Sequence, residues 1–70
     1  MALNYAYNYA EIDPSTGMCI GVMSTSAEQT ESEILVAIPV NDTNYMGKYY
    51  INGAWYEDPA GTIPWTSSLI

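Results

Sequence analysis

The residues KYYINGAWYE, at positions 48–57, predict two short strands joined by an Asn-Gly turn. Asn and Gly accept the positive φ that a type I′ turn needs at both central positions, which favours a two-residue hairpin. Counting outward from the turn gives four opposed pairs: Ile51 with Ala54, Tyr50 with Trp55, Tyr49 with Tyr56, and Lys48 with Glu57. We therefore expect a ribbon that is apolar on both faces, with the only cation of the chain opposite a carboxylate.

A second hairpin is predicted near the start of the chain. Residues 4–12 alternate strictly between two faces, which is the period of a β-strand, and one face carries a stripe of tyrosines. Residues 13–17 supply Pro and Gly for a tight turn, and residues 18–23 continue as the second strand. Gly21 within that strand indicates a bulge or the close approach of an aromatic ring across the ladder.

The middle of the chain predicts a loop, one strand and a short turn. Residues 24–33 are polar and lack apolar periodicity, which favours a loop over a helix. Residues 34–40 form an apolar run typical of a buried strand, and Pro39 marks its end or an edge position. Residues 41–46 indicate a turn or a helical turn that Asp42 can cap.

We expect residues 1–70 to form a single small all-β domain. Its predicted architecture is a small antiparallel sheet of four to five strands, built from two hairpins plus one connecting strand, with room for one short helical turn. Residues 61–70 are expected to be a packing tail or a docking segment. In that tail, Trp65, Leu69 and Ile70 are the expected anchors, lying over a neighbour in the same chain or in another copy.

The size of the chain favours association. A chain of 70 residues buries only about 60% of its unfolded surface on folding, so a lone monomer has little stability to spare. Small domains compensate with disulfides, metals or oligomerisation, but Cys19 has no partner cysteine and the chain has no His. Association with copies of itself or with a larger assembly is therefore the expected stabilising device.

The charge of the chain excludes several partners. The formal net charge is -7, from eight carboxylates and one Lys. Nucleic-acid binding needs Lys and Arg to replace phosphate counterions, so DNA and RNA are not expected as partners, and anionic membranes are disfavoured for the same reason. The N-terminus lacks the basic region and apolar run of a secretory signal, so we expect synthesis in a cytoplasm without signal-directed secretion.

The sequence offers little catalytic chemistry. It has no His as a general base, and Cys19 on an apolar strand is typical of a small core residue rather than a nucleophile. A Ca²⁺ site from Asn41, Asp42 and Asn44 is an alternative to a simple capped turn, but the spacing of an EF-hand is missing. We expect no enzymatic activity, no catalytic residue, no cofactor and no metal.

The aromatic residues are the candidate functional side chains. All are Tyr or Trp, with no Phe, and these types favour surfaces that are apolar on one side and wet on the other. Three interpretations remain open for them: contacts between subunits, an ordinary core, and stacking on carbohydrate. The interface or ligand-binding candidates are Tyr5, Tyr7, Tyr9, Tyr49, Tyr50, Trp55, Tyr56 and Trp65.

Three motifs in this order resemble a known group of proteins. They are YAEID at 9–13, MCIGV at 18–22 and YMGKYYINGAWYE at 45–57. The pattern resembles small proteins, and the matching terminal segments of tail-fibre proteins, encoded in the tail and host-recognition modules of phages and prophages of Gram-positive bacteria. The resemblance covers about residues 7–57. The Tyr-Asn repeat before Tyr9 and the tail from Gly61 to Trp65 depart from it.

The resemblance implies a non-enzymatic virion structural protein of the tail or fibre. Such a protein is made in the bacterial host cytoplasm and forms a homo-oligomer, of which a trimer is one form, in contact with other tail or fibre proteins. One alternative is a small carbohydrate-binding module at a fibre tip, for which burial of Tyr50, Trp55 and Trp65 would remove the platform. Another is an acidic phage-encoded inhibitor of a host protein, which would need its carboxylates along one face.

Overall fold

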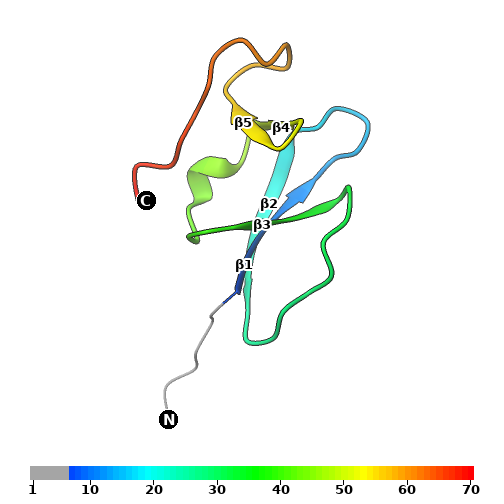
Figure 1. The fold of residues 1–70 in the computed structure, drawn as a ribbon, viewed down its shortest axis with the longest axis vertical. Helices are drawn as coiled ribbons and strands as arrows, with labels where there is room; N and C mark the ends of the chain where they lie inside the picture. The colour runs from blue at the N-terminus through cyan, green and yellow to red at the C-terminus, as the bar shows by residue number, and fades with distance from the viewer. Residues whose placement is uncertain (1–6) are drawn as a thin grey trace.

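The computed structural model describes residues 7–70, which are all-β (Figure 1). The elements in chain order are β1 (Tyr7–Ile12), β2 (Cys19–Thr25), β3 (Leu35–Ile38), the 3-10 turn η1 (Thr43–Tyr45), β4 (Tyr49–Ile51) and β5 (Ala54–Tyr56). These strands form a three-stranded antiparallel sheet in the order β2-β1-β3 and a separate β4-β5 hairpin. The all-β, antiparallel prediction is confirmed, and the division of the strands between two sheets is a finding of the structure.

The β4-β5 hairpin has the predicted register. Tyr49 opposes Tyr56, Tyr50 opposes Trp55 and Ile51 opposes Ala54. Asn52 and Gly53 have φ of 50° and 83°, as a type I′ turn requires. The ladder ends at the Tyr49 pair, so the predicted pairing of Lys48 with Glu57 is wrong.

The β1-β2 ladder contains the predicted bulge next to Gly21. Glu11 opposes Gly21 and Ile12 opposes Cys19, which leaves Ile20 as the extra residue. A Cβ at Gly21 would lie 3.2 Å from Glu11 Oε1. The side chain that approaches Gly21 is therefore a carboxylate, and the alternative of an aromatic ring is wrong.

The polar segment between β2 and β3 is a loop, as predicted, although β2 takes its first two residues and ends at Thr25. β3 is shorter than predicted, because it ends at Ile38, directly before Pro39. Asp42 caps η1 by accepting a hydrogen bond from the Asn44 N–H, which confirms the capped helical turn.

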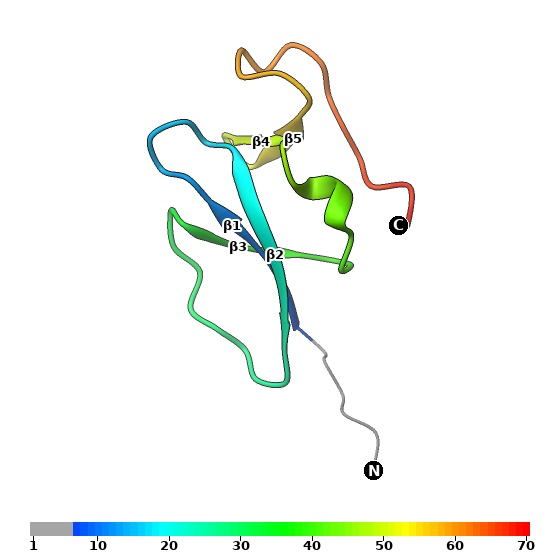
Figure 2. The same ribbon diagram turned by 180° about the vertical axis from the view of Figure 1, so that it is seen from behind.

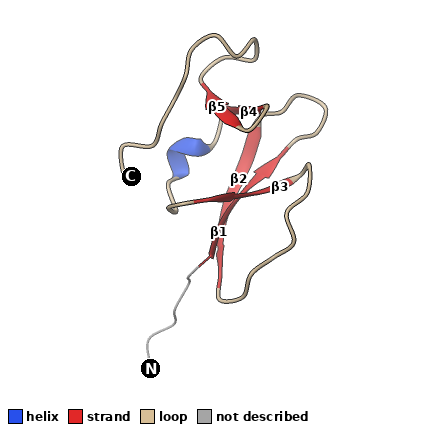
Figure 3. Ribbon diagram, viewed as in Figure 1, coloured by secondary structure: helices blue, strands red, loops and turns tan. Residues whose placement is uncertain are grey.

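Backbone hydrogen bonds join the hairpin to the larger sheet and to the tail. The Cys19 N–H donates to the Lys48 carbonyl over 2.8 Å, so the start of β4 lies beside the start of β2 (Figure 3). On the other side of the hairpin, the Trp65 N–H donates to the Trp55 carbonyl over 3.0 Å and the Glu57 N–H donates to the Ile63 carbonyl over 2.8 Å. The tail therefore runs beside β5 as an added extended segment.

The core lies between one face of the three-stranded sheet and the segment that carries η1. Its buried residues are Ala10, Ile12, Cys19, Val36, Ile38 and Tyr45. Trp65 packs against this cluster, as expected of an anchor, whereas Leu69 and Ile70 are 60% and 70% exposed and do not anchor the tail within the chain. Within residues 7–70, no helix is long and apolar enough to cross a membrane.

Candidate interaction surface

An apolar groove lies where the hairpin, η1 and the tail meet. It has a volume of about 340 Å³. Its walls come from four segments, with Pro39, Tyr45, Ala54, Trp55, Pro64, Trp65, Thr66, Ser67 and Ile70 lining it. The groove therefore depends on the tail being held against the hairpin, and the tail supplies about half of its lining.

Three aromatic rings build the floor of the groove around Tyr45. The ring centroids of Tyr45 and Trp55 are 4.9 Å apart with an interplanar angle of 70°, and those of Tyr45 and Trp65 are 4.8 Å apart at 81°. Edge-to-face contacts at these distances are the favourable geometry for aromatic pairs. Tyr45 is 2% exposed, whereas both indoles are half-buried, so each Trp presents part of its surface to solvent.

The lysine next to β4 lies against this cluster. Lys48 Nζ is 4.9 Å from the centroid of the Trp65 ring, a cation–π contact. This contact takes the place of the ion pair that the hairpin register predicted with Glu57. The only Lys or Arg side chain of the chain thus lies over part of one indole of the groove.

A buried hydrogen-bonded pair holds the tail in place. Ser67 Oγ donates to Asp42 Oδ2 over 2.5 Å, and the two residues are 4% and 3% exposed. The Asn44 N–H donates to the other carboxylate oxygen over 2.9 Å, and the Leu69 N–H donates to Ser67 Oγ over 3.1 Å. The Ser67 and Asn44 hydrogen bonds hold the pKa of Asp42 below its ordinary value.

These contacts also bear on the alternative of a Ca²⁺ site at this turn. Both carboxylate oxygens of Asp42 accept hydrogen bonds from the chain itself. Across residues 7–70, no three or more His, Cys, Asp or Glu side chains gather in a group that could hold a metal ion. Asp42 acts in the structure as a cap and as the acceptor that fastens Ser67.

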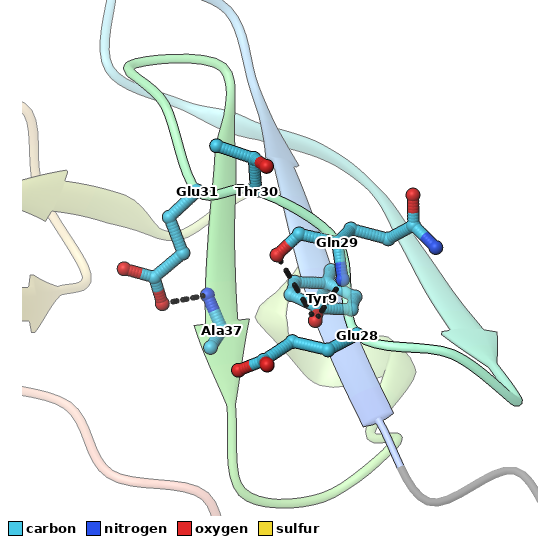
Figure 4. A pocket seen from close by; sticks show the side chains of 6 residues that line it. All are labelled: Tyr9, Glu28, Gln29, Thr30, Glu31 and Ala37. Carbon is cyan, nitrogen blue, oxygen red and sulfur yellow. Dashed lines mark hydrogen bonds between the residues drawn. The ribbon is translucent and has the colours of Figure 1, made fainter.

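A second hollow lies on the face of the three-stranded sheet that points away from the core (Figure 4). Tyr9 forms its floor, the loop residues 28–31 form one wall and Ala37 of β3 forms the other, enclosing about 400 Å³. The Gln29 N–H donates to the Tyr9 hydroxyl over 2.7 Å, and Glu31 Oε1 accepts from the Ala37 N–H over 3.0 Å. These bonds fasten the loop to the sheet, and they account for the 2% exposure of Tyr9.

The structure brings some of the predicted interface residues together and separates others. Tyr50, Trp55 and Trp65 are half-buried and packed against the core, around the groove or beside it. Tyr49 and Tyr56 form the next pair of the same hairpin and are also half-buried. The remaining candidates belong to the other sheet or lie outside the described residues.

Of those remaining candidates, Tyr7 is 38% exposed and Tyr9 is buried under the loop, so Tyr9 is a structural residue. Tyr5 lies outside the described residues. Sequence reasoning missed Tyr45 and Ser67. Tyr45 had a usable signal, because an aromatic residue three positions after a capping Asp falls in the first helical turn and can point back to the core. Ser67 had none, because its partner is 25 residues away.

Comparison of the chain with known protein families, with curated proteins and with solved structures found no match.

Proposed function

We propose that this protein is a non-enzymatic structural subunit of a phage or prophage tail or fibre. It assembles as a homo-oligomer through its Tyr/Trp-rich surface, and it contacts other tail or fibre proteins in the virion after synthesis in the host cytoplasm. The sequence resemblance supports the phage assignment. The observation that carries the assembly role is the apolar groove, in which Trp55 of the hairpin and Trp65 of the tail remain half-exposed.

The exposed tail residues strengthen the interface role. Ile63, Leu69 and Ile70 are 50%, 60% and 70% exposed, and Ile70 lines the groove. Full burial of one such side chain contributes about 1.5–3 kcal/mol, so a partner that covers this end of the molecule gains substantially. Aromatic residues that are half-buried on one side are also the side chains most enriched at protein interfaces.

The chemistry of the side chains supports a role without catalysis. The chain has no His, and burial raises the pKa of the Cys19 thiol, which disfavours the reactive thiolate. The hydroxyl of Tyr9 and the carboxylate of Asp42, both in buried residues, are occupied by hydrogen bonds to the chain itself.

The test is the solution mass of the purified protein, measured by light scattering after size exclusion at several concentrations. We expect a closed oligomer, such as a dimer or a trimer, at micromolar concentrations. Ile70→Asp should raise the dissociation constant of the oligomer at least about tenfold, because the charge enters an interface core. Ile34→Asp is the matched control, since Ile34 is 52% exposed, is not one of the residues that line the groove and gains the same charge. A monomer at all concentrations would overturn the assembly role.

The two indoles of the groove also favour a second function, a carbohydrate-binding module at a fibre tip. Sugar rings stack on flat aromatic faces. In this groove, Lys48 covers part of the Trp65 ring, and Tyr45 packs edge-to-face with both indoles, so less of each indole face is free for a sugar. Isothermal titration with purified cell-wall polysaccharide separates the two functions. Saturable binding that is lost in Trp55→Ala and retained in Tyr7→Ala, by a monomeric protein, would favour the carbohydrate-binding module.

A further inference from the structure

Among residues 7–70, the outer edge of β2 is open from Ile20 to Thr25. β2 is the last strand of its sheet, and its first residue, Cys19, exchanges backbone hydrogen bonds with Gly47 and Lys48 on the far side. From Ile20 to Thr25, no described residue hydrogen-bonds to the backbone groups on that side. In Figure 2, β2 lies in front of β1 and β3. η1 lies close to β2, and Asn41 Nδ2 donates to Ser24 Oγ over 2.5 Å, but neither takes a backbone group of residues 20–25.

The ladder determines which backbone groups lie on this edge. Along a pair of antiparallel strands, opposed residues alternate between two kinds. In one kind the two residues form both N–H···O=C hydrogen bonds with each other, and in the other kind their N–H and C=O groups point away from each other. The Ala37 N–H bonds to a side chain outside the sheet, so Tyr9, which opposes it, directs its own groups toward Met23 on β2. Met23 therefore faces β1, and the N–H and C=O groups of Val22 and Ser24 face outward.

The opposite edge of the same sheet is protected. On β3, the Leu35 N–H donates to the Ser32 carbonyl over 3.3 Å, and the Ser32 N–H donates to the Leu35 carbonyl over 2.9 Å. The Ala37 N–H is taken by Glu31. Natural sheets blunt their exposed edges with such local cover and with charge, because a free edge pairs with other strands. In the part of the chain that the structure describes, the β2 edge from Ile20 to Thr25 has neither device.

The charge pattern selects the partner. Residues 14–27 carry no charged side chain, although the chain has eight carboxylates and a net charge of -7. Two copies therefore repel each other over most of their surfaces, because both are negatively charged. Along β2 they can approach without placing the carboxylates of one copy opposite those of the other. A free, uncharged and self-complementary edge therefore fits a second copy of this chain better than a charged partner.

We propose that β2 pairs antiparallel with β2 of a second copy, about a two-fold axis at Met23. Val22 then opposes Ser24 of the partner subunit. In each of the two such pairs, the outward N–H and C=O groups of one residue form hydrogen bonds with those of the other. The two three-stranded sheets become one continuous sheet. The inference deepens the proposed function, because it rests on self-association and names the strand that makes the contact.

A cysteine pair tests the register. Met23 and the partner's Met23 form a pair without backbone hydrogen bonds, with Cα atoms about 4.5 Å apart, which is within disulfide range. Met23→Cys should form a covalent dimer under mild oxidation at least about ten times faster than Ser26→Cys, whose copies lie about 20 Å apart in this register. Cys19 is 1% exposed and present in both variants. Equal rates would overturn the register.

Two lysine variants test whether β2 pairing contributes to the free energy of association. Met23→Lys places two ammonium groups at the axis, whereas Ser26→Lys makes the same change of net charge, from -7 to -7 + 1 = -6, at the end of the strand. Sedimentation equilibrium should show a dissociation constant at least tenfold higher for Met23→Lys and little changed for Ser26→Lys, with both variants folded by circular dichroism. Unchanged association of Met23→Lys would overturn the pairing.

The two interfaces are separable by these variants. Loss of association in Ile70→Asp together with full association in Met23→Lys would overturn β2 pairing and leave the groove interface. Loss in Met23→Lys with full association in Ile70→Asp would support β2 pairing and overturn the role of the groove.

Discussion

At the scale of single residues, Gly53 shows how one backbone conformation sets the hairpin. Its φ is 83°, and a Cβ built there would meet no other atom within 4 Å. Gly53→Ala therefore adds strain of the left-handed backbone without a steric clash, and it should lower the free energy of unfolding by about 1–2 kcal/mol. Urea denaturation followed by circular dichroism measures the change.

Asn52→Gly is the matched control for this prediction, because glycine accepts the φ of 50° at that position. It should change the free energy of unfolding little. A loss equal to that of Gly53→Ala would show that the Asn52 side chain, and not backbone strain, determines the stability of the turn.

Asp42 makes the attachment of the tail sensitive to acid. Its hydrogen bonds with Ser67 and Asn44 lower its pKa below the ordinary value of 3.8, so the folded state binds the proton less tightly than the unfolded chain. The stabilisation is complete above pH 3.8 and is lost as the pH falls through the lowered pKa. The thermal midpoint should therefore fall more steeply below pH 4 in the wild type than in Asp42→Asn.

Asp13 and Asp58 have lowered pKa values as well, through hydrogen bonds with Ser15 and Thr62, so part of the acid sensitivity persists in Asp42→Asn. Ser67→Ala separates the contributions, because it removes the largest cause of the Asp42 shift and leaves the other two carboxylates unchanged. Identical pH profiles for the wild type and both variants would contradict the role of this pair.

At the scale of elements, the loop between β2 and β3 serves as the cover of an edge strand. Glu31→Ala removes the acceptor of the Ala37 N–H, and that amide should exchange with solvent about five times faster, as expected when a hydrogen bond worth about 1 kcal/mol is lost. Glu31→Gln keeps an acceptor at the same place and should retain the protection. Amide hydrogen exchange by NMR compares them, and equal exchange in all three proteins would show that the contact is not maintained in solution.

The strands and turns were predictable where neighbouring residues in the sequence determine their conformation. The hairpin register follows from Asn52 and Gly53 alone, and the bulge follows from a glycine in a short strand. The position of the tail was not predictable, because it depends on the contact between Asp42 and Ser67 and on hydrogen bonds to β5. The burial of Tyr9 likewise depends on a loop whose sequence carries no periodic pattern.

The aromatic residues of the hairpin and Trp65 are half-buried, so part of each remains available to a partner, whereas Tyr9, which shares the predicted tyrosine stripe, is buried. Residues on one face of β1 have different surroundings, since Tyr7 is exposed and Tyr9 is covered by the loop. Alternation identifies the two faces of a strand, but it does not say what lies over each face.

At the scale of the whole molecule, the core is small enough that one buried side chain supplies a large part of the free energy of unfolding. The net stability of a domain of this length is about 4–10 kcal/mol, and removing most of a buried Ile costs about 2–5 kcal/mol. Ile38, which is 5% exposed, lies in the core, so Ile38→Ala should lower the midpoint of thermal unfolding by at least 10 °C.

Ile20→Ala is the control for the core prediction, because the side chain at the bulge is 53% exposed. Its midpoint should stay within a few degrees of the wild type. A large loss in Ile20→Ala, at a concentration where the protein associates, would instead indicate that the bulge is covered in the assembly.

The clustering of Trp55 and Trp65 has an optical consequence. The chain has two Trp residues, both lie against Tyr45, and the three-stranded sheet contains none. Indole emission therefore reports the environment of the groove alone. If the tail detaches while the sheet stays folded, the emission should move to longer wavelength with no change in the far-ultraviolet spectrum, and a partner that fills the groove should move it to shorter wavelength.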